Sequence, residues 1–325
     1  MYDLSILPVR LEERFLQHED WRWGYFTNAD GARLRAGWID PRPRKSVRAT
    51  AITLPGFGGF AEQWFELFRD LLDRGIAVRH LDWLGQGGSD RYLENGHKMH
   101  SLGYDRDVRD LHEFLTRFIE VNLDRPVFFL AHSMGAHIAL RYLTERPDAV
   151  RGAFLTAPML QVHTEKAPPV VAAQTARLMT WLGRGSSYIV GHEDWWFREN
   201  YPVEDSRLSQ DPVRYRVAQL YYRLEPSLRI GGGTWRWLHE TFRSIGYLRR
   251  PSALGRVTTP TYIASADNDV IVQNDAHRAA ADVMPNCRIE SYPDAKHDIW
   301  MEKDSIREPL LAALDRFLAE QVGVR

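Results

Sequence analysis

The sequence contains a single cysteine and almost equal numbers of basic and acidic residues. Because Cys287 is the single cysteine of the sequence, an internal disulfide and a cluster of thiolate metal ligands are both excluded. The 42 Lys and Arg residues against 43 Asp and Glu give a formal net charge of −1, which offers no excess of basic residues to a polyanion. We therefore expect a protein of a reducing compartment with no nucleic-acid partner.

Long apolar runs are missing as well. No stretch approaches the roughly 18 apolar residues that a membrane-spanning helix requires. The segment Met1–Ser5 does not begin a basic region followed by an apolar one, as a secretory signal would. These features predict a cytoplasmic protein without a membrane span.

Motifs for metals and nucleotides are also lacking. His97, His100, His132 and His137 have no carboxylates placed as in His-Glu-x-x-His. The glycine-rich stretch 82–89 lacks the Gly-Lys-Ser/Thr ending of a phosphate-binding loop and the spacing of a dinucleotide site. We therefore expect neither a metal nor a cofactor.

Strand-like and helix-like runs alternate along most of the chain. Runs rich in β-branched and aromatic residues predict strands at 21–27, 32–39, 49–54, 76–81, 127–131, 152–156, 261–265 and 288–292. Apolar residues at helical spacing predict a helix after each of the later strands, and the charge run 105–110 is interpreted as the solvated start of one of them. Strands separated by single helices imply right-handed crossovers, so the chain is predicted to be an α/β protein with a mostly parallel sheet between helices.

The alternation of strand-like and helix-like runs stops after the sixth predicted strand. Residues 158–257 hold few strand-like runs, but five tryptophans and six tyrosines. We predict a helical cap, or lid, over 158–257, inserted into a core formed by 1–157 and 258–325. The glycines at 183–185 and 231–233 are interpreted as hinges, and the aromatic side chains as both the packed core of the cap and the lining of an apolar pocket.

The central motif of the sequence is His132-Ser133-Met134-Gly135, which joins a predicted strand directly to a predicted helix. A serine at such an elbow sits in a strained backbone with its hydroxyl exposed, beside the free N–H groups of a helix start. The pattern is Gly-x-Ser-x-Gly with Ala131 in the first glycine place. Ser133 is therefore a candidate nucleophile, and His132 is expected to pack beneath the elbow. The alternative is a tight turn in which Ser133 only caps the helix.

Two further candidates follow late strands. An acid, Asp267 or Asp269, comes after one strand, and His297 comes after the last. Serine, acid and histidine then follow the chain order used by α/β-hydrolases, and loops at the carboxyl edge of a parallel sheet can converge. His297 would take the proton of Ser133 and return it to the leaving alkoxide, while the carboxylate holds the imidazole in the required tautomer.

These motifs together resemble the monoacylglycerol lipase and lysophospholipase branch of the α/β-hydrolases. The resemblance covers nearly the whole chain and is carried by Pro55-Gly56-Phe57, Asp82-x-x-Gly85-x-Gly87-x-Ser89, the serine motif, Thr234-x-x-Trp237-Leu238 and Asp294-Ala295-Lys296-His297. It implies an α/β-hydrolase fold that hydrolyses carboxylic esters of acyl or alkyl chains through an acyl-enzyme, without a cofactor.

The resemblance also assigns roles to residues. Asp269-Val270-Ile271-Val272 matches the family's Asp-x-x-Val, which favours Asp269 as the triad acid and leaves Asp267 to cap the turn. The oxyanion hole is expected to consist of the backbone N–H groups of Phe57 and Met134, each worth on the order of 10²–10³ in rate. Pro55 replaces the family's usual histidine, which we expect to alter the support of the loop more than the chemistry.

The substrate is less closely defined than the reaction. We expect a small-molecule ester or lipid, with monoacylglycerols or lysophospholipids as the first interpretation and short-chain or synthetic esters of a general carboxylesterase as the second. A peptidase of the proline-iminopeptidase kind and a non-catalytic binding protein remain as alternatives. The sequence leaves open the oligomeric state, and whether the cap touches a membrane surface.

Overall fold

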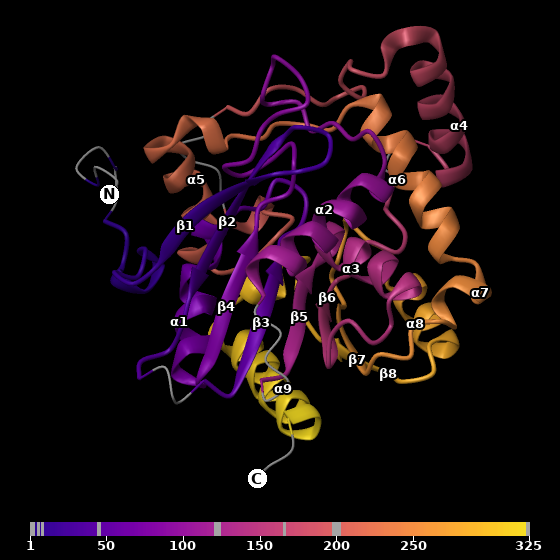
Figure 1. Ribbon diagram of the computed structural model, residues 1–325. Helices are drawn as coiled ribbons and strands as arrows, with labels where there is room; N and C mark the ends of the chain where they lie inside the picture. Colours follow the sequence, from indigo (N-terminus) through magenta and orange to yellow (C-terminus); the bar gives the residue numbers. More distant parts are fainter. Residues whose placement is uncertain are drawn as a thin grey trace.

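The computed structural model describes residues 4, 7, 10–43, 47–119, 125–164, 167–196 and 203–322. A central sheet is covered by helices on both faces, and α4 and α5 lie beyond the ends of the strands (Figure 1). The order of the elements is the alternation of strands and helices that the sequence predicts.

Eight strands form the sheet in the order β1-β2-β4-β3-β5-β6-β7-β8. β1 and β2 are antiparallel, as are β2 and β4, whereas all other neighbours are parallel. The strands are β1 Arg22–Thr27, β2 Arg33–Ile39, β3 Ala49–Leu54, β4 Ile76–Leu81, β5 Val127–His132, β6 Gly152–Thr156, β7 Thr261–Ala266 and β8 Cys287–Tyr292. The predicted strands and the mostly parallel α/β fold are confirmed.

Alternate residues of the strands supply two separate cores. In β5, Phe128 and Leu130 face the core shared with α1 and α9, whereas Phe129 and Ala131 face the core shared with α2, α3 and α8. These helices are α1 Phe65–Asp73, α2 Tyr104–Phe118, α3 Ser133–Glu145, α8 Asn274–Val283 and α9 Asp304–Val322. Strands buried on both faces explain why β3, β5 and β7 consist mostly of β-branched, aromatic and small residues without alternation of apolar and charged ones.

Between β6 and β7, none of the described residues belongs to the sheet, and we call residues 158–257 the inserted segment. Its elements are α4 Pro169–Met179, a π-helix Thr180–Arg184, α5 Arg214–Leu224, α6 Trp235–Leu248, α7 Pro251–Leu254, and short 3₁₀ helices at Val203–Asp205 and Pro226–Leu228. α4 packs along α6 at one end of this layer, and α5 lies at the other (Figure 1).

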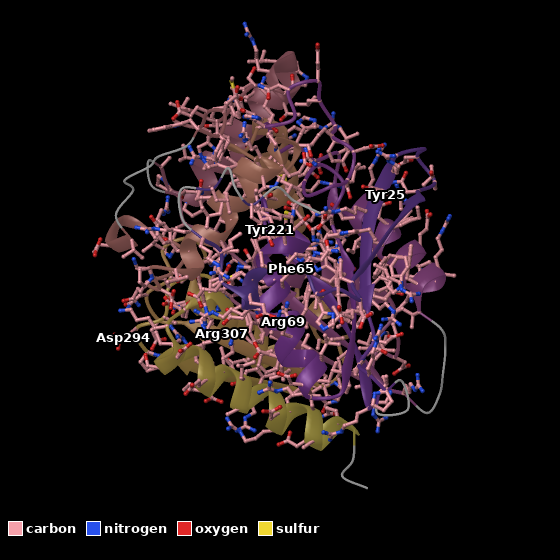
Figure 2. All side chains as sticks on the ribbon, turned by 90° about the vertical axis from the view of Figure 1, so that its left-hand side faces the viewer. Tyr25, Phe65, Arg69, Tyr221, Asp294 and Arg307 are labelled. Atoms are coloured by element: carbon pink, nitrogen blue, oxygen red, sulfur yellow. The ribbon has the colours of Figure 1, made fainter. Side chains whose placement is uncertain are left out.

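Buried polar contacts fasten α5 and α6 to the core. Arg214 of α5 is 3% exposed and donates to both carboxylate oxygens of Glu66 on α1 at 2.7 and 2.8 Å. Tyr221 of α5 packs edge-on against Phe65 of α1, on the face shown in Figure 2. On α6, Ser244 lies 2.6 Å from His137 Nε2 of α3. Breaking such a contact would leave buried polar groups unpaired, so this inner part is held in place.

The glycines of the inserted segment have two kinds of surroundings. A Cβ atom on Gly231 would lie 2.3 Å from the carbonyl oxygen of Glu193, and one on Gly232 would lie 2.3 Å from His192 Cβ. These two glycines permit close packing within the inserted segment, and the hinge at 231–233 stays a prediction. Gly183 is different, because it has a φ of 75° and no atom within 4 Å of its Cβ position.

The charge run 105–110 was predicted to be solvated, but only part of it is. Asp105 and Arg109 are exposed, but Asp107 and Asp110 are only 7% and 3% exposed. Burial, with the charge of Asp110, raises the pKa of Asp107 to about 8. Burial also raises the pKa of Asp110, to about 6, although Asn28 Nδ2 donates to it at 2.8 Å. The charge pattern identified the helix but not the side that it buries.

Candidate active site

The site is built at the point where β5 ends and α3 begins. Ser133 has a φ of 50°, a left-handed conformation that a serine adopts only under constraint. A Cβ atom on Gly135 would lie 2.4 Å from the carbonyl oxygen of Leu54, so glycine allows α3 to start against the end of β3. Ala131 is fully buried in the first glycine place of the motif. The predicted strand, elbow and helix are all present.

Three predicted residues meet at the carboxyl edge of the sheet. Ser133 Oγ lies 2.9 Å from His297 Nε2, and His297 Nδ1 lies 2.6 Å from Asp269 Oδ2. Ser133 and His297 are 5% and 3% exposed. A hydroxyl, an imidazole and a carboxylate in this series can pass a proton from the hydroxyl to the ring while the carboxylate stabilises the resulting cation.

Asp269, and not Asp267, contacts the histidine. Its second oxygen accepts hydrogen bonds from the N–H groups of Ile271 and Val272 at 2.7 and 2.9 Å. Burial acts to raise the pKa of Asp269, but the hydrogen bond and charge of His297 with these two donors outweigh it and hold that pKa below its usual value. Asp269 thus also makes the turn-capping contacts predicted for Asp267, which is exposed.

The loop that carries His297 is held by a residue that sequence reasoning missed. Glu302 is fully buried; its Oε1 accepts from the N–H of Lys296 at 2.8 Å and its Oε2 from the N–H of Gln210 at 3.0 Å. Asp294, at the start of this loop, has a φ of 62°. Only the spacing of Glu302, five residues after the histidine, could have drawn attention to it.

His132 lies beside the triad histidine. The ring centroids of His132 and His297 are 4.8 Å apart, and His132 Nδ1 lies 3.0 Å from Thr156 Oγ1. Burial, followed by the charge of His297, lowers the pKa of His132 to about 3. His132 therefore stays neutral at physiological pH and does not compete with His297 as a base.

The two predicted oxyanion donors belong to two segments next to the nucleophile. Met134 is in the first turn of α3, where N–H groups have no partner within the helix. Phe57 follows Gly56, whose Cβ position is 3.0 Å from Ser133 Cβ, and its N–H has no hydrogen-bond partner among the described residues. The Phe57 ring is half exposed and meets Trp237 of α6 edge-on, with centroids 4.9 Å apart.

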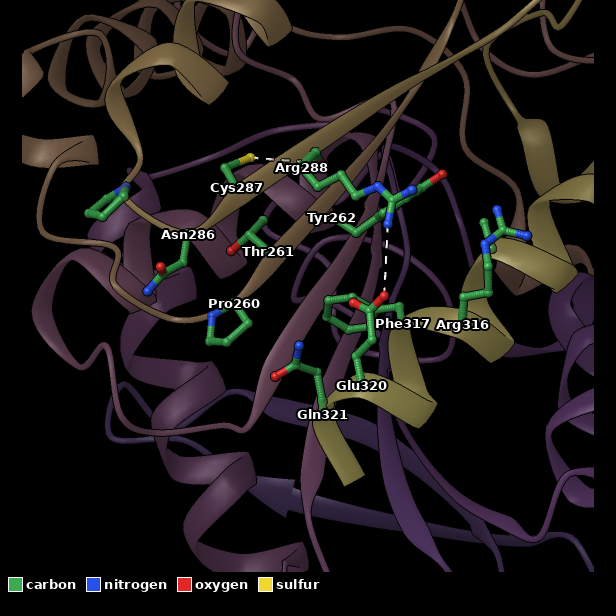
Figure 3. A pocket seen from close by; sticks show the side chains of 12 residues that line it. Pro260, Thr261, Tyr262, Asn286, Cys287, Arg288, Arg316, Phe317, Glu320 and Gln321 are labelled. Atoms are coloured by element: carbon green, nitrogen blue, oxygen red, sulfur yellow. Dashed lines mark hydrogen bonds and ion pairs between the residues drawn. The ribbon is translucent and has the colours of Figure 1, made fainter. Parts of the chain in front are cut away.

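A pocket of about 230 Å³ lies away from this site, at the start of β7 and β8 (Figure 3). Its lining includes Pro260, Cys287 and Arg288, and Arg288 forms an ion pair of 3.8 Å with Glu320. A six-residue strand spans about 17 Å, which separates this pocket from the triad at the other end of β7. Burial raises the pKa of Cys287 to about 12, so the thiol is not a nucleophile near neutral pH.

Among the described residues, no group of three or more His, Cys, Asp or Glu side chains could hold a metal ion. In that part of the chain, no helix has the length and apolar character needed to cross a membrane.

Comparison with known proteins places the chain in a family. The pattern of the hydrolase family described as serine aminopeptidase, S33, matches residues 45–304. The chain is 28% identical to the probable lysophospholipase L2 of Haemophilus influenzae over 281 residues, which cover 86% of this chain and 87% of that protein. It is also 28% identical to lysophospholipase L2 of Escherichia coli K12 over 297 residues, covering 86% and 85%.

A solved structure supports the same fold. A soluble variant of monoglyceride lipase from Saccharomyces cerevisiae, in complex with a substrate analogue, superposes with a TM-score of 0.74 and 18% identity over 95% of this chain and 98% of that one. The predicted resemblance to the lipase and lysophospholipase branch of the α/β-hydrolases is confirmed. The chain belongs to the serine aminopeptidase (S33) family of hydrolases.

Proposed function

We propose that this protein is a serine ester hydrolase that cleaves monoacylglycerols or lysophospholipids through an acyl-enzyme on Ser133. The observation that carries the proposal is the hydrogen-bonded series Ser133, His297 and Asp269. The names of the relatives, lysophospholipase L2 and monoglyceride lipase, support the lipid substrate.

The reaction follows from the roles of these groups. Ser133 Oγ attacks the ester carbonyl while His297 Nε2 takes its proton, and Asp269 stabilises the imidazolium. The negative charge on the carbonyl oxygen is held by the N–H groups of Phe57 and Met134. His297 then protonates the leaving alcohol. His297 then takes a proton from a water molecule, which attacks the acyl-enzyme. The acid is released when His297 returns that proton to Ser133.

We propose that the inserted segment, residues 158–257, is the cap over this site. Two of its helices reach the oxyanion loop: Tyr222 of α5 donates to the carbonyl of Gly58 at 3.2 Å, and Trp237 of α6 contacts Phe57. The low exposure of Ser133 and His297 agrees with a covered site. A cover of aromatic residues beside the nucleophile suits an acyl chain, because such a chain gains free energy by leaving water.

The outer surface of the cap suits contact with lipid. α4 and the following π-helix expose the apolar side chains of Val170, Val171, Leu178, Trp181 and Leu182. The stretch 169–184 carries two arginines and no acidic residue, a composition that favours an anionic lipid surface. We propose that the cap binds the cytoplasmic face of a membrane transiently while its substrate enters.

A substrate series tests the function. Rates are measured on monoacylglycerols and lysophosphatidylcholines from short to oleoyl chains, beside p-nitrophenyl esters and a prolyl-naphthylamide. We expect hydrolysis that extends to long acyl chains, its loss in Ser133→Ala, and labelling of Ser133 by a fluorophosphonate.

Each alternative has its own result. Rates that fall beyond short chains, with none on monoacylglycerols, would indicate a general carboxylesterase. Activity confined to the prolyl amide would indicate an aminopeptidase. Folded protein whose Ser133 stays unlabelled would indicate a binding protein without catalysis.

A further inference from the structure

We propose that Gln86 is the positioning residue of the oxyanion loop, and that it aims the Phe57 N–H at the reacting carbonyl oxygen. This inference rests on the proposed function. It assigns a role to the glycine-rich stretch 82–89, which lacks the features of a phosphate-binding loop and takes no part in the triad.

The side chain of Gln86 clamps the loop on both sides of Phe57. Its Oε1 accepts from the N–H of Gly58 at 3.0 Å, while its Nε2 donates to the carbonyl oxygens of Gly56 at 2.7 Å and Gly59 at 2.8 Å. Gln86 is fully buried, so water does not compete for these bonds.

The pattern of donors and acceptors requires an amide. The loop offers one N–H and two carbonyl oxygens, and only a side chain that both accepts and donates satisfies all three. A carboxylate at this position would accept from Gly58 but would face the two carbonyl oxygens without a proton. An apolar side chain would leave the Gly58 N–H and the Gly59 carbonyl without their partner. The Gly56 carbonyl would keep only the N–H of Gly59, at 3.1 Å.

The loop needs such a clamp because of its composition. Gly56, Gly58 and Gly59 flank Phe57, and Gly58 has a φ of 67°, so side-chain sterics alone do not fix the direction of the Phe57 N–H. Pro55 offers only its carbonyl, which accepts from Trp83 Nε1 at 2.9 Å. Gln86 and Trp83 both come from the same stretch, 82–89.

Gln86 is itself held by the stretch around it. Its N–H donates to the carbonyl of Trp83 at 3.1 Å. Asp82, fully buried, accepts from the N–H of Gly88 at 2.8 Å and from the N–H of Ala61, just beyond the oxyanion loop, at 3.2 Å. Arg35 donates to the same carboxylate at 2.6 Å. One buried acid thus joins the two loops and fixes the clamp relative to Ser133.

A donor that is fixed before the substrate binds stabilises the transition state and lowers the reaction barrier, without raising the affinity for the ground-state substrate. Loss of the clamp should therefore lower kcat and leave KM almost unchanged. Because Gln86 contacts no reacting atom, we expect the effect of losing the clamp to be smaller than the 10²–10³ of losing an oxyanion donor, about 10- to 100-fold.

The experiment compares Gln86→Met, which removes all three bonds at similar length, and Gln86→Glu, which keeps only the acceptor. The matched control is Ser244→Ala, which removes buried hydrogen bonds to His137 and Arg141 far along α6. kcat and KM are measured on p-nitrophenyl butyrate well below the melting temperature of each variant. Affinity for a trifluoromethyl ketone, whose hemiketal with Ser133 mimics the tetrahedral intermediate, is measured beside that for an unreactive ketone.

We expect both Gln86 variants to lose kcat and trifluoromethyl ketone affinity by the same factor, with KM and the affinity for the unreactive ketone within twofold of the wild type. If Gln86→Met does not fold, Gln86→Glu carries the same comparison. A kcat equal to that of Ser244→Ala, or a change in KM alone, would overturn the role of Gln86 and leave the proposed function standing. Wild-type protein without esterase activity would overturn both.

Discussion

The carboxyl edge of the sheet and the outer surface of the proposed cap differ in how their side chains are buried and paired. At the edge, Ser133, His297 and Asp269 are buried and hydrogen-bonded, and the backbone is constrained at Ser133. On α4, only Ala176 is buried, and Trp181 just beyond it is 80% exposed. The first region is complete before any substrate arrives, whereas the second leaves apolar surface for something outside the chain. Under the proposed function, the reaction therefore belongs to the first region and the choice of substrate to the second.

The largest expected effect lies at the edge of the sheet. Asp269→Asn should lower kcat by roughly 10⁴, because the amide presents the wrong hydrogen-bonding group to His297 and cannot stabilise the imidazolium. Asp267→Asn, two residues away and exposed, is the matched control and should stay within about twofold of the wild type. Steady-state kinetics on a soluble ester measure both, and a large loss in Asp267→Asn alone would place the acid at the other position.

A second prediction concerns Asp107, a buried carboxyl that lacks the hydrogen-bonded histidine of Asp269. The pKa of Asp107 is raised to about 8 in the folded protein, so the unfolded chain releases this proton at lower pH than the native one. Stability should therefore fall as pH rises from about 4 to about 8 and level off above it. Asp107→Asn should remove this fall and be more stable than the wild type by a few kcal/mol at pH 9, with little difference near pH 4.

Urea unfolding of Asp107→Asn and of the wild type across this range tests the sign. Asp105→Asn, at an exposed position of the same helix turn, serves as the control. This variant keeps Asp107, so its stability should fall with pH as that of the wild type does. A stability difference that is constant with pH would mean that burial of Asp107 does not govern its ionisation.

A third prediction locates the boundary between the fixed and the open part of the cap. Gly232→Ala should cost about 2 kcal/mol or more of unfolding free energy, because its Cβ would overlap His192. Gly183→Ala should cost only about 1 kcal/mol, the strain of a positive φ, since its Cβ would meet nothing. Equal losses in thermal unfolding would show that the two glycines are equally constrained.

The sequence predicted what is local or ordered along the chain, and it could not predict what tertiary packing decides. Ser133, Asp269 and His297 follow recognisable strands in a fixed order, so their meeting could be foreseen. Gln86 and Glu302 could not be assigned a role, because their partners are backbone groups brought near by folding. The same limit explains the one error.

That error was the solvated charge run. Asp107 was predicted to be solvated because its neighbours in sequence are charged, although the helix turns it inward. The hinge at 231–233 stays a prediction. The structure adds that the small size of Gly232 is what its packing against His192 requires, a role that the residue type alone does not reveal.

The smallest effect is expected on the outer surface of the cap. Trp181→Ser should weaken binding to anionic vesicles about tenfold, because an exposed indole that enters the interface loses its contact with water. Tyr25→Ser is the matched control, since Tyr25 is a half-exposed aromatic residue on β1 (Figure 2) and should not affect vesicle binding. Sedimentation with phosphatidylglycerol vesicles measures binding, and kcat on a soluble ester should be unchanged in both variants. Equal vesicle binding by Trp181→Ser and the wild type would contradict the proposed lipid contact of the cap. It would leave the proposed triad chemistry standing, because the two regions are expected to act separately.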